Sequence, residues 1–241
     1  MWVTQPRTAC ARSKCHKVSV HCRVERTSEF SIRSAWAEAW SHSAFRIGIY
    51  TSAIAAVLLG IGLPIFFGYI GNKPGSLLND PVLDAVGPVD VTWISFTVLY
   101  GMVVLAIGRA VRTPWILLRG LHAYALMMVL RMFAMYTITL EAPLDIIPLI
   151  DPVTSNFYPG KVPFSKDLFF SGHTATIALL FCISTGKPMR SLGFLATVAI
   201  GVLVIVQHVH WTVDVLAAPL FVWLAWKGSA LTLRLCGKRA V

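Results

Sequence analysis

Two histidines and one aspartate stand where a largely apolar chain could use them for chemistry. Between Arg190 and Lys227 the only charged residue is Asp214, and His210 precedes it by four positions. A carboxylate that accepts a hydrogen bond from one imidazole nitrogen fixes the tautomer of the ring and leaves the other nitrogen to act as a nucleophile or a base. A second imidazole, that of His173, can exchange a proton with a leaving or attacking oxygen. These groups suit phosphoryl transfer through a phosphohistidine.

Charge on the phosphoryl oxygens during such a transfer requires positive groups nearby. Three cations precede His173 in the chain and could supply that charge: Arg131, Lys161 and Lys166. Main-chain N–H groups around Ser171 and Gly172 could add to it if a helix begins there. Ser171 and Thr174 have an equally good structural explanation, because serine and threonine cap helices.

The rest of the chain must hold these groups together, and its composition indicates how. Hydrophobic residues make up 56% of the 241 positions and charged residues 13%, about half the ~25% typical of a soluble domain. Several apolar stretches are each close to the ~20 residues that cross a bilayer, and they lie at about 47–70, 91–109, 118–139, 168–186, 191–208 and 210–226. We therefore expect an all-α integral membrane protein with six transmembrane helices.

The net charge of +10 reflects membrane topology rather than a nucleic-acid partner. With the N-terminus inside, most Lys and Arg lie in segments on that side, whereas acidic residues gather in outer loops at about 71–90 and 140–167. This positive-inside pattern places both termini in the cytoplasm. We divide the chain into a basic, disordered cytoplasmic segment (1–46), a six-helix membrane domain (47–227) and a basic cytoplasmic tail (228–241).

The same topology places the candidate groups at one height. His173 lies near the outer end of the fourth expected span, and His210 and Asp214 lie at the tip of the hairpin made by the fifth and sixth. On a helix His210 and Asp214 share a face, whereas His208 points elsewhere. The hairpin carries no Gly or Pro turn signal. Arg131 and Asp214 are ionisable residues within spans, which marks them as candidate functional residues, although an ion pair that holds helices together would also explain them.

The motifs around the histidines resemble those of a known enzyme family. SGHT (171–174) and HVHWTVD (208–214) are similar to the two signature motifs of the sphingomyelin synthase family, a branch of the type 2 phosphatidic acid phosphatase superfamily. RMFAMYTITLEAP (131–143) resembles the arginine-bearing third span of that family, and Asp167 matches the acid before its Ser-Gly-His motif. The resemblance covers roughly residues 50–226.

The resemblance implies a catalytic triad in which His210 attacks phosphorus, Asp214 orients His210, and His173 exchanges a proton with the leaving group. It also implies headgroup-binding or supporting positions, which are Arg131, Asp167, His208, Ser171 and Gly172. The protein would move a phospho-headgroup from a membrane phospholipid to a ceramide-like lipid alcohol on the extracytoplasmic side, with no metal or cofactor. The protein could also form a homo-oligomer, and no nucleic-acid partner is expected.

Departures from related families bear on the choice of reaction. Lipid phosphate phosphatases carry a Lys-x6-Arg-Pro motif and a Ser-Arg before the last His motif, and both are missing here, where Val206 and Gln207 precede His208. This favours a transferase over a phosphomonoesterase. The main alternative is a phospholipase C-like or lipid-phosphate hydrolase with the same triad and water as the acceptor. The loop before His173 is shorter than in the animal synthases and has no cysteine, which leaves the headgroup and the acceptor open.

Two alternatives come from other classes of protein. A proton-coupled carrier could use Arg131, Asp214 and the histidines as a relay, but His173 and His210 lie too far from the bilayer midplane. A zinc or iron site could use His208, His210, Asp214 and His173 as ligands. His208 and His210 would then have to point the same way, which only a non-helical hairpin tip allows. The N-terminal cysteines and histidines match no common zinc spacing, and they are Cys10, Cys15, His16, His21 and Cys22.

Overall fold

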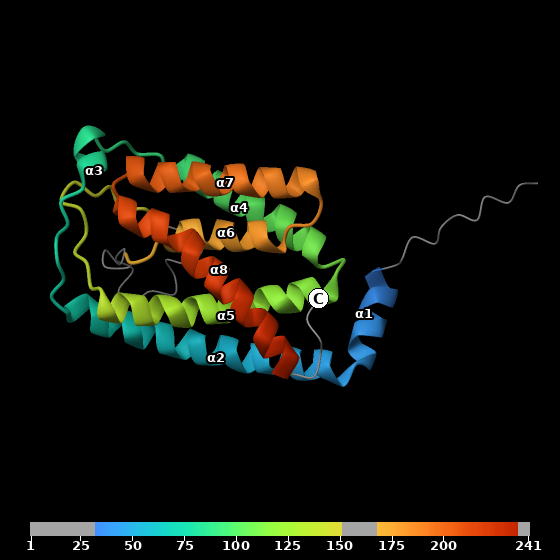
Figure 1. The fold of residues 1–241 in the computed structure, drawn as a ribbon. Helices are drawn as coiled ribbons and strands as arrows, with labels where there is room; N and C mark the ends of the chain where they lie inside the picture. The colour runs from blue at the N-terminus through green and yellow to red at the C-terminus, as the bar shows by residue number, and fades with distance from the viewer. Residues whose placement is uncertain (1–31, 151–167, 236–241) are drawn as a thin grey trace, which may run out of the picture. The chain divides into compact units, whose positions relative to one another are not determined.

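The structure is a computed structural model that describes residues 32–150 and 168–235, and these residues form a helical bundle (Figure 1). The helices are α1 (Ile32–Ser41), α2 (Ser43–Asn72), α3 (Pro81–Ala85), α4 (Thr92–Ala110), α5 (Pro114–Thr137), α6 (Gly172–Ile183), α7 (Lys187–Val206) and α8 (Thr212–Leu235). Within the described ranges, strand-like pairing is limited to one isolated bridge between Ser76 and Leu140. The expectation of an all-helical fold is confirmed for this part of the chain.

Five of the helices are long and apolar enough to cross a membrane, judged by length and composition, and they are α2, α4, α5, α7 and α8. The fourth expected span, 168–186, instead forms α6, which has 12 residues and a length of only about 18 Å. The helix begins where the Ser171 hydroxyl accepts the Thr174 N–H, and it ends before Gly186, whose φ of +82° suits only a residue without Cβ.

The ends of the expected membrane domain also differ from the structure. Residues 32–46, placed with the disordered N-terminal segment, form α1 and the start of α2. Residues 228–235, placed in the cytoplasmic tail, continue α8 to Leu235. The apolar pattern alone could not show this, because Arg46, Lys227 and Arg234 are charged residues that a helix carries beyond its hydrophobic centre.

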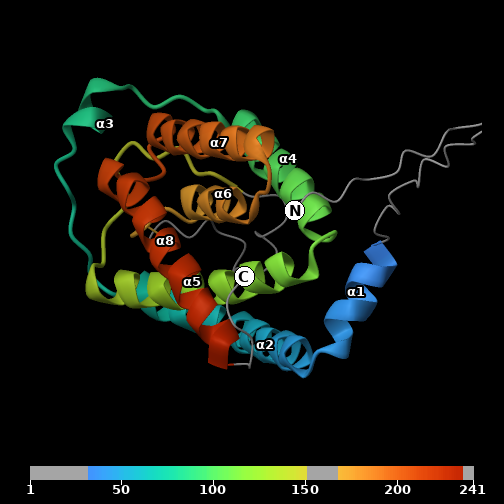
Figure 2. The same ribbon diagram turned by 45° about the vertical axis from the view of Figure 1, so that its right-hand side comes forward.

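Helix α6 lies inside the bundle, and α4, α5, α7 and α8 all pack against it (Figures 1 and 2). Seven of its 12 residues are buried: Thr174, Ala175, Ile177, Ala178, Leu179, Leu180 and Ile183. In contrast, α2 and α7 expose large apolar side chains such as Ile65 and Leu195, as expected of surfaces that face lipid. Because protein surrounds α6, its non-helical flanks do not leave backbone polar groups in lipid.

Three connecting segments gather at one end of the bundle, where α2, α5 and α7 finish and α4, α6 and α8 begin (Figure 1). We call this the loop end, and it contains residues 73–91, 138–150 and 207–211. The first two segments are joined by hydrogen bonds from Ser76 N to Thr139 O and from Glu141 N to Ser76 O, both 3.0 Å. Gly75 permits this approach, since a Cβ there would lie 2.8 Å from the carbonyl carbon of Leu140.

Candidate active site at the loop end

The chain reverses between α7 and α8 without a glycine or proline. His208 takes the left-handed conformation, with φ at +56°, and the Val209 N–H bonds back to Val204 O at 3.0 Å. Left-handed backbone is uncommon for residues other than glycine, although histidine is among those enriched there. The His208 ring is buried, and its Nε2 donates to Val86 O at 2.7 Å. His208 therefore fastens the turn to the loop that follows α3.

The first turn of α8 is held by two carboxylates. Asp214 Oδ2 accepts the main-chain N–H of Trp211 at 3.1 Å. The third residue of α8 thus bonds to Trp211, the residue that precedes the helix. Asp80, from the distant 73–91 segment, accepts the Thr212 N–H at 2.7 Å and the Thr212 hydroxyl at 3.0 Å. Both carboxylates also lie at the positive end of the helix dipole, which stabilises them.

The pKa of Asp80 reflects these contacts. Burial acts to raise the pKa, but hydrogen bonds from Thr212 and from the amides of Val82 and Leu83 outweigh it and hold the pKa below its ordinary value. The carboxylate is the form that the fold stabilises.

His210 and Asp214 come together as the sequence predicts, but by a different geometry. Helix α8 begins at Thr212, so His210 lies in the turn before the helix and not one helical turn from Asp214. His210 Nδ1 is 3.6 Å from Asp214 Oδ2, and the residues are 2% and 0% exposed. Within the described part of the chain, neither His210 Nδ1 nor Asp214 Oδ1 has a hydrogen-bond partner. Catalytic contacts of this kind are commonly long without substrate and tighten when it binds.

His173, the second residue of α6, faces His210. Their ring centroids are 6.3 Å apart, with the planes at 64°. The two helices that carry the site are tied at their starts, because the Ser171 N–H donates to Asp214 O at 3.1 Å. On its other side the His173 ring meets the edge of Phe96 on α4, at a centroid distance of 6.3 Å.

Arg131 brings a positive charge to the start of α6. It lies on α5, is 2% exposed, and its guanidinium is 5.7 Å from the ring centroid of Phe170. A Cβ on Gly172 would lie 3.1 Å from Arg131 Cζ, so glycine at this position lets the guanidinium approach the helix start this closely. The cation and the helix N-terminus together favour an anion beside His173.

The structure thus collects six of the eight predicted site residues, which are His173, His210, Asp214, Arg131, Ser171 and Gly172. His208 is separate, since its ring is directed to the loop at Val86. Asp167, with Lys161 and Lys166, lies outside the described residues. Ser171 caps the N-terminus of α6, which is the structural role that the sequence offered as an alternative to anion binding.

Sequence reasoning missed Asp80 and Gln207. Asp80 stands 132 positions before Thr212, and its only sequence signal, an acid directly before Pro81, indicates a helix start at α3 and not the contact with α8. Gln207 is fully buried, and its amide group bonds to Thr92 Oγ1 at 2.7 Å and to Ile147 O at 3.3 Å.

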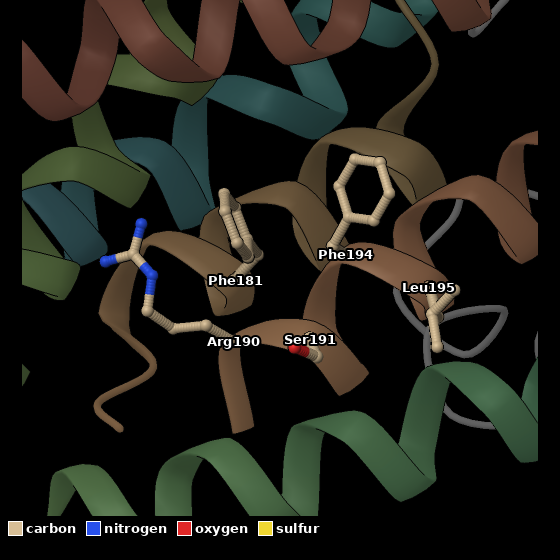
Figure 3. Close-up of a pocket in the computed structure, with 5 residues that line it drawn as sticks. All are labelled: Phe181, Arg190, Ser191, Phe194 and Leu195. Atoms are coloured by element: carbon tan, nitrogen blue, oxygen red, sulfur yellow. The ribbon is translucent and has the colours of Figure 1, made fainter. Parts of the chain in front are cut away.

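A pocket lies at the other end of the bundle, between α6 and α7 (Figure 3). It is lined by Phe181, Arg190, Ser191, Phe194 and Leu195. The Arg190 guanidinium stands 5.1 Å from the centroid of the Phe181 ring. The two histidines lie at the start of α6 and at the end of α7, so this pocket is separate from them.

The hairpin tip is non-helical, which is the condition that a metal site would need. Among residues 32–150 and 168–235, however, no three His, Cys, Asp or Glu side chains are close enough to hold a metal ion. The His208 ring is hydrogen-bonded to Val86 O, so it is not available to the proposed metal site.

Comparison with known proteins identifies a relationship for the C-terminal part of the chain. Residues 166–230, which include α6, α7 and most of α8, match the family described as PAP2 superfamily C-terminal. No curated protein compared with the chain matches it. The family match supports the type 2 phosphatidic acid phosphatase superfamily.

Proposed function

We propose that the protein is a lipid phosphotransferase of the sphingomyelin synthase type, which moves a phospho-headgroup from a glycerophospholipid to a ceramide-like lipid alcohol. The family match supports the broader class, an enzyme of the lipid phosphatase or phosphotransferase type. The observation that carries the proposal is the pair of imidazoles, His173 and His210, that face each other with Asp214 behind one of them.

The geometry suggests a role for each nitrogen. Asp214 faces Nδ1 of His210, so Nε2 is the nitrogen that would attack phosphorus. As the N–P bond forms, the P–O bond to diacylglycerol breaks, and His173 donates a proton to the departing oxygen. In the second half, His173 removes the proton from the hydroxyl of the acceptor, whose oxygen attacks phosphorus while the N–P bond breaks. Arg131 and the start of α6 stabilise charge on the phosphoryl oxygens in both halves.

Burial of two triad residues supports transfer to an alcohol, since His210 and Asp214 are almost inaccessible to solvent. Water competes with the lipid alcohol for the phosphohistidine, and a buried site limits that side reaction.

The distribution of charge supports a site on the extracytoplasmic side. Basic residues gather at the end opposite the loop end, and those in the described ranges include Arg109, Arg112, Arg119, Lys187, Arg190, Lys227 and Arg234. The loop end instead carries Asp80, Asp84, Asp90, Glu141 and Asp145. By the positive-inside rule the basic end faces the cytoplasm.

The test is to incubate membranes that contain the protein with a fluorescent ceramide and unlabelled phospholipid. We expect a new fluorescent phosphosphingolipid, and we expect His173→Ala and His210→Ala each to lower its formation by at least about 100-fold. His42→Ala, which changes an exposed histidine, is the matched control.

Each other outcome has a distinct meaning. Free diacylglycerol without a labelled product would show hydrolysis and refute the transferase. Activity near the wild-type level in either histidine variant would refute the triad. Loss of activity in EDTA that zinc restores would show a metal enzyme instead.

A further inference from the structure

Beside the triad, on the side of α4 and α7, lies a small group of uncharged polar residues. Thr92 and Ser95 are one turn apart on α4 and so lie on one side of that helix. Gln207, at the end of α7, bonds to Thr92 Oγ1 at 2.7 Å. Arg131 approaches α6 from α5, and α6 lies between α5 and α7 in both views (Figures 1 and 2). Gln207 therefore comes from an element on the side of α6 opposite α5.

The hydrogen bonds of Gln207 fix which way its amide group points. Ile147 O can only accept, so the nitrogen of the amide faces it at 3.3 Å. Thr92 Oγ1 accepts from the same nitrogen at 2.7 Å. Both N–H bonds of the Gln207 amide are used, and its oxygen points away from these partners.

Two polar atoms of this group are buried without a partner in the described part of the chain. They are Gln207 Oε1 and Ser95 Oγ, on residues that are 0% and 1% exposed. A buried polar atom without a hydrogen bond is unfavourable, so such atoms mark a place where a ligand group can bind. The amide oxygen can only accept, and the ligand group must therefore carry a hydrogen on nitrogen or oxygen.

The residues that carry these atoms are linked to the reacting groups through their neighbours in the chain. Phe96, the residue after Ser95, touches the His173 ring at a centroid distance of 6.3 Å, and Gln207 precedes His210 by three positions. A lipid phosphate between the two histidines would carry its substituents within reach of α4 and of the end of α7.

We propose that Gln207 and Ser95 bind an N–H or O–H group of the lipid substrate beside the transferred phosphate and so select substrates that carry one. This inference rests on the proposed function for the place of the phosphate. Two sources have this chemistry. A ceramide-like acceptor offers an amide N–H and a second hydroxyl that diacylglycerol lacks, and an ethanolamine headgroup offers N–H groups that choline lacks.

The test compares Gln207→Met and Ser95→Ala with the wild type for three acceptors, ceramide, N-methyl ceramide and 3-deoxyceramide, and for two donors, phosphatidylethanolamine and phosphatidylcholine. Methionine keeps the length of the glutamine side chain and removes only its polar end. Matched controls are Asn72→Leu, an exposed amide, and Thr97→Ala, whose hydroxyl bonds within its own helix to Trp93 O at 2.7 Å.

We expect each site variant to raise KM about 3- to 10-fold for the lipid that carries the hydrogen, the size of one buried hydrogen bond, and to leave KM for its analogue unchanged. A change of KM among the acceptors would show that the bound group belongs to the acceptor lipid, and a change among the donors would show that it belongs to the headgroup. Equal KM ratios in the wild type and both variants, with folded protein at the control level, would overturn the inference.

Labelling with a photoactivatable ceramide and a photoactivatable phosphatidylethanolamine separates this inference from the proposed function. Labelling that falls in Gln207→Met and Ser95→Ala while no transfer occurs would retain the binding site and refute the transferase. Transfer with unchanged KM and unchanged labelling would retain the transferase and refute the binding site. Ser95→Ala removes no side-chain hydrogen bond in the described part of the chain, so it remains informative if Gln207→Met does not fold.

Discussion

Replacing Gly172 by alanine tests whether the position of the Arg131 guanidinium matters for catalysis. The new Cβ would lie 3.1 Å from Cζ and Nη2 of Arg131 and 3.3 Å from Nη1, closer than ordinary van der Waals contact, so the guanidinium must retreat by a few tenths of an ångström. Catalytic groups tolerate about 0.5 Å of displacement, and about 1 Å costs about 100-fold. We expect kcat to fall about tenfold.

The fold itself should tolerate this substitution. Gly172 is the first residue of α6 and has an ordinary φ, and alanine is favoured over glycine in a helix by up to about 1 kcal/mol. The protein level and thermal stability should therefore remain at the wild-type value. Gly101→Ala on α4, where a Cβ has nothing within 4 Å, is the matched control.

The assay is the rate of headgroup transfer in detergent or vesicles, measured in two backgrounds. In Arg131→Met, which keeps the length of the side chain but removes its charge, Gly172→Ala should have almost no further effect, because the displaced group is already gone. Equal losses in both backgrounds would refute the reasoning, since the effect would then not pass through Arg131. Wild-type activity in Gly172→Ala would show that the guanidinium is not used at this position.

Two further predictions concern the loop end. The pKa of Asp80 lies below its ordinary value, so its stabilising contribution is present above the unfolded pKa, near ~4, and is lost as the pH falls through the folded pKa. Asp80→Asn should therefore lower Tm at pH 7, and the Tm difference from the wild type should shrink below about pH 4; a difference that is constant with pH would contradict this. His208→Ala removes the hydrogen bond to Val86 O and should cost about 1–2 kcal/mol of stability while kcat of the folded fraction changes less than threefold, as measured by thermal denaturation and by the transfer rate per folded protein. A loss of kcat as large as that of His210→Ala would instead give His208 a catalytic role.

The apolar pattern was enough to predict five helices that can cross a membrane, because such helices need a run of about 20 apolar residues whatever surrounds them. It could not predict that α6 is short, since its flanks 168–171 and 184–186 are also apolar or small and differ from the helix only in their capping. That difference depends on Ser171 and Gly186, whose effect is local and easily missed in a hydrophobic run.

The sequence was enough to predict which residues belong to the candidate site, but not how the backbone brings them together. Spacing placed His210 and Asp214 together on a helix, whereas the structure achieves the same proximity with a turn, because Asp214 bends back to the Trp211 N–H. The contact of Asp80 with Thr212 joins residues 132 positions apart and depends on how two loops fold, which no local pattern contains.

The position of α6 has a consequence for assembly. The five longer helices can each remain in a bilayer alone, as a two-stage view of membrane protein folding requires. Helix α6 is too short to do so and becomes stable only once α4, α5, α7 and α8 enclose it. His173 is carried by this element, so the two imidazoles meet only after the other helices have packed. Headgroup transfer would then report completed assembly, and variants that slow helix association would delay the appearance of activity after synthesis.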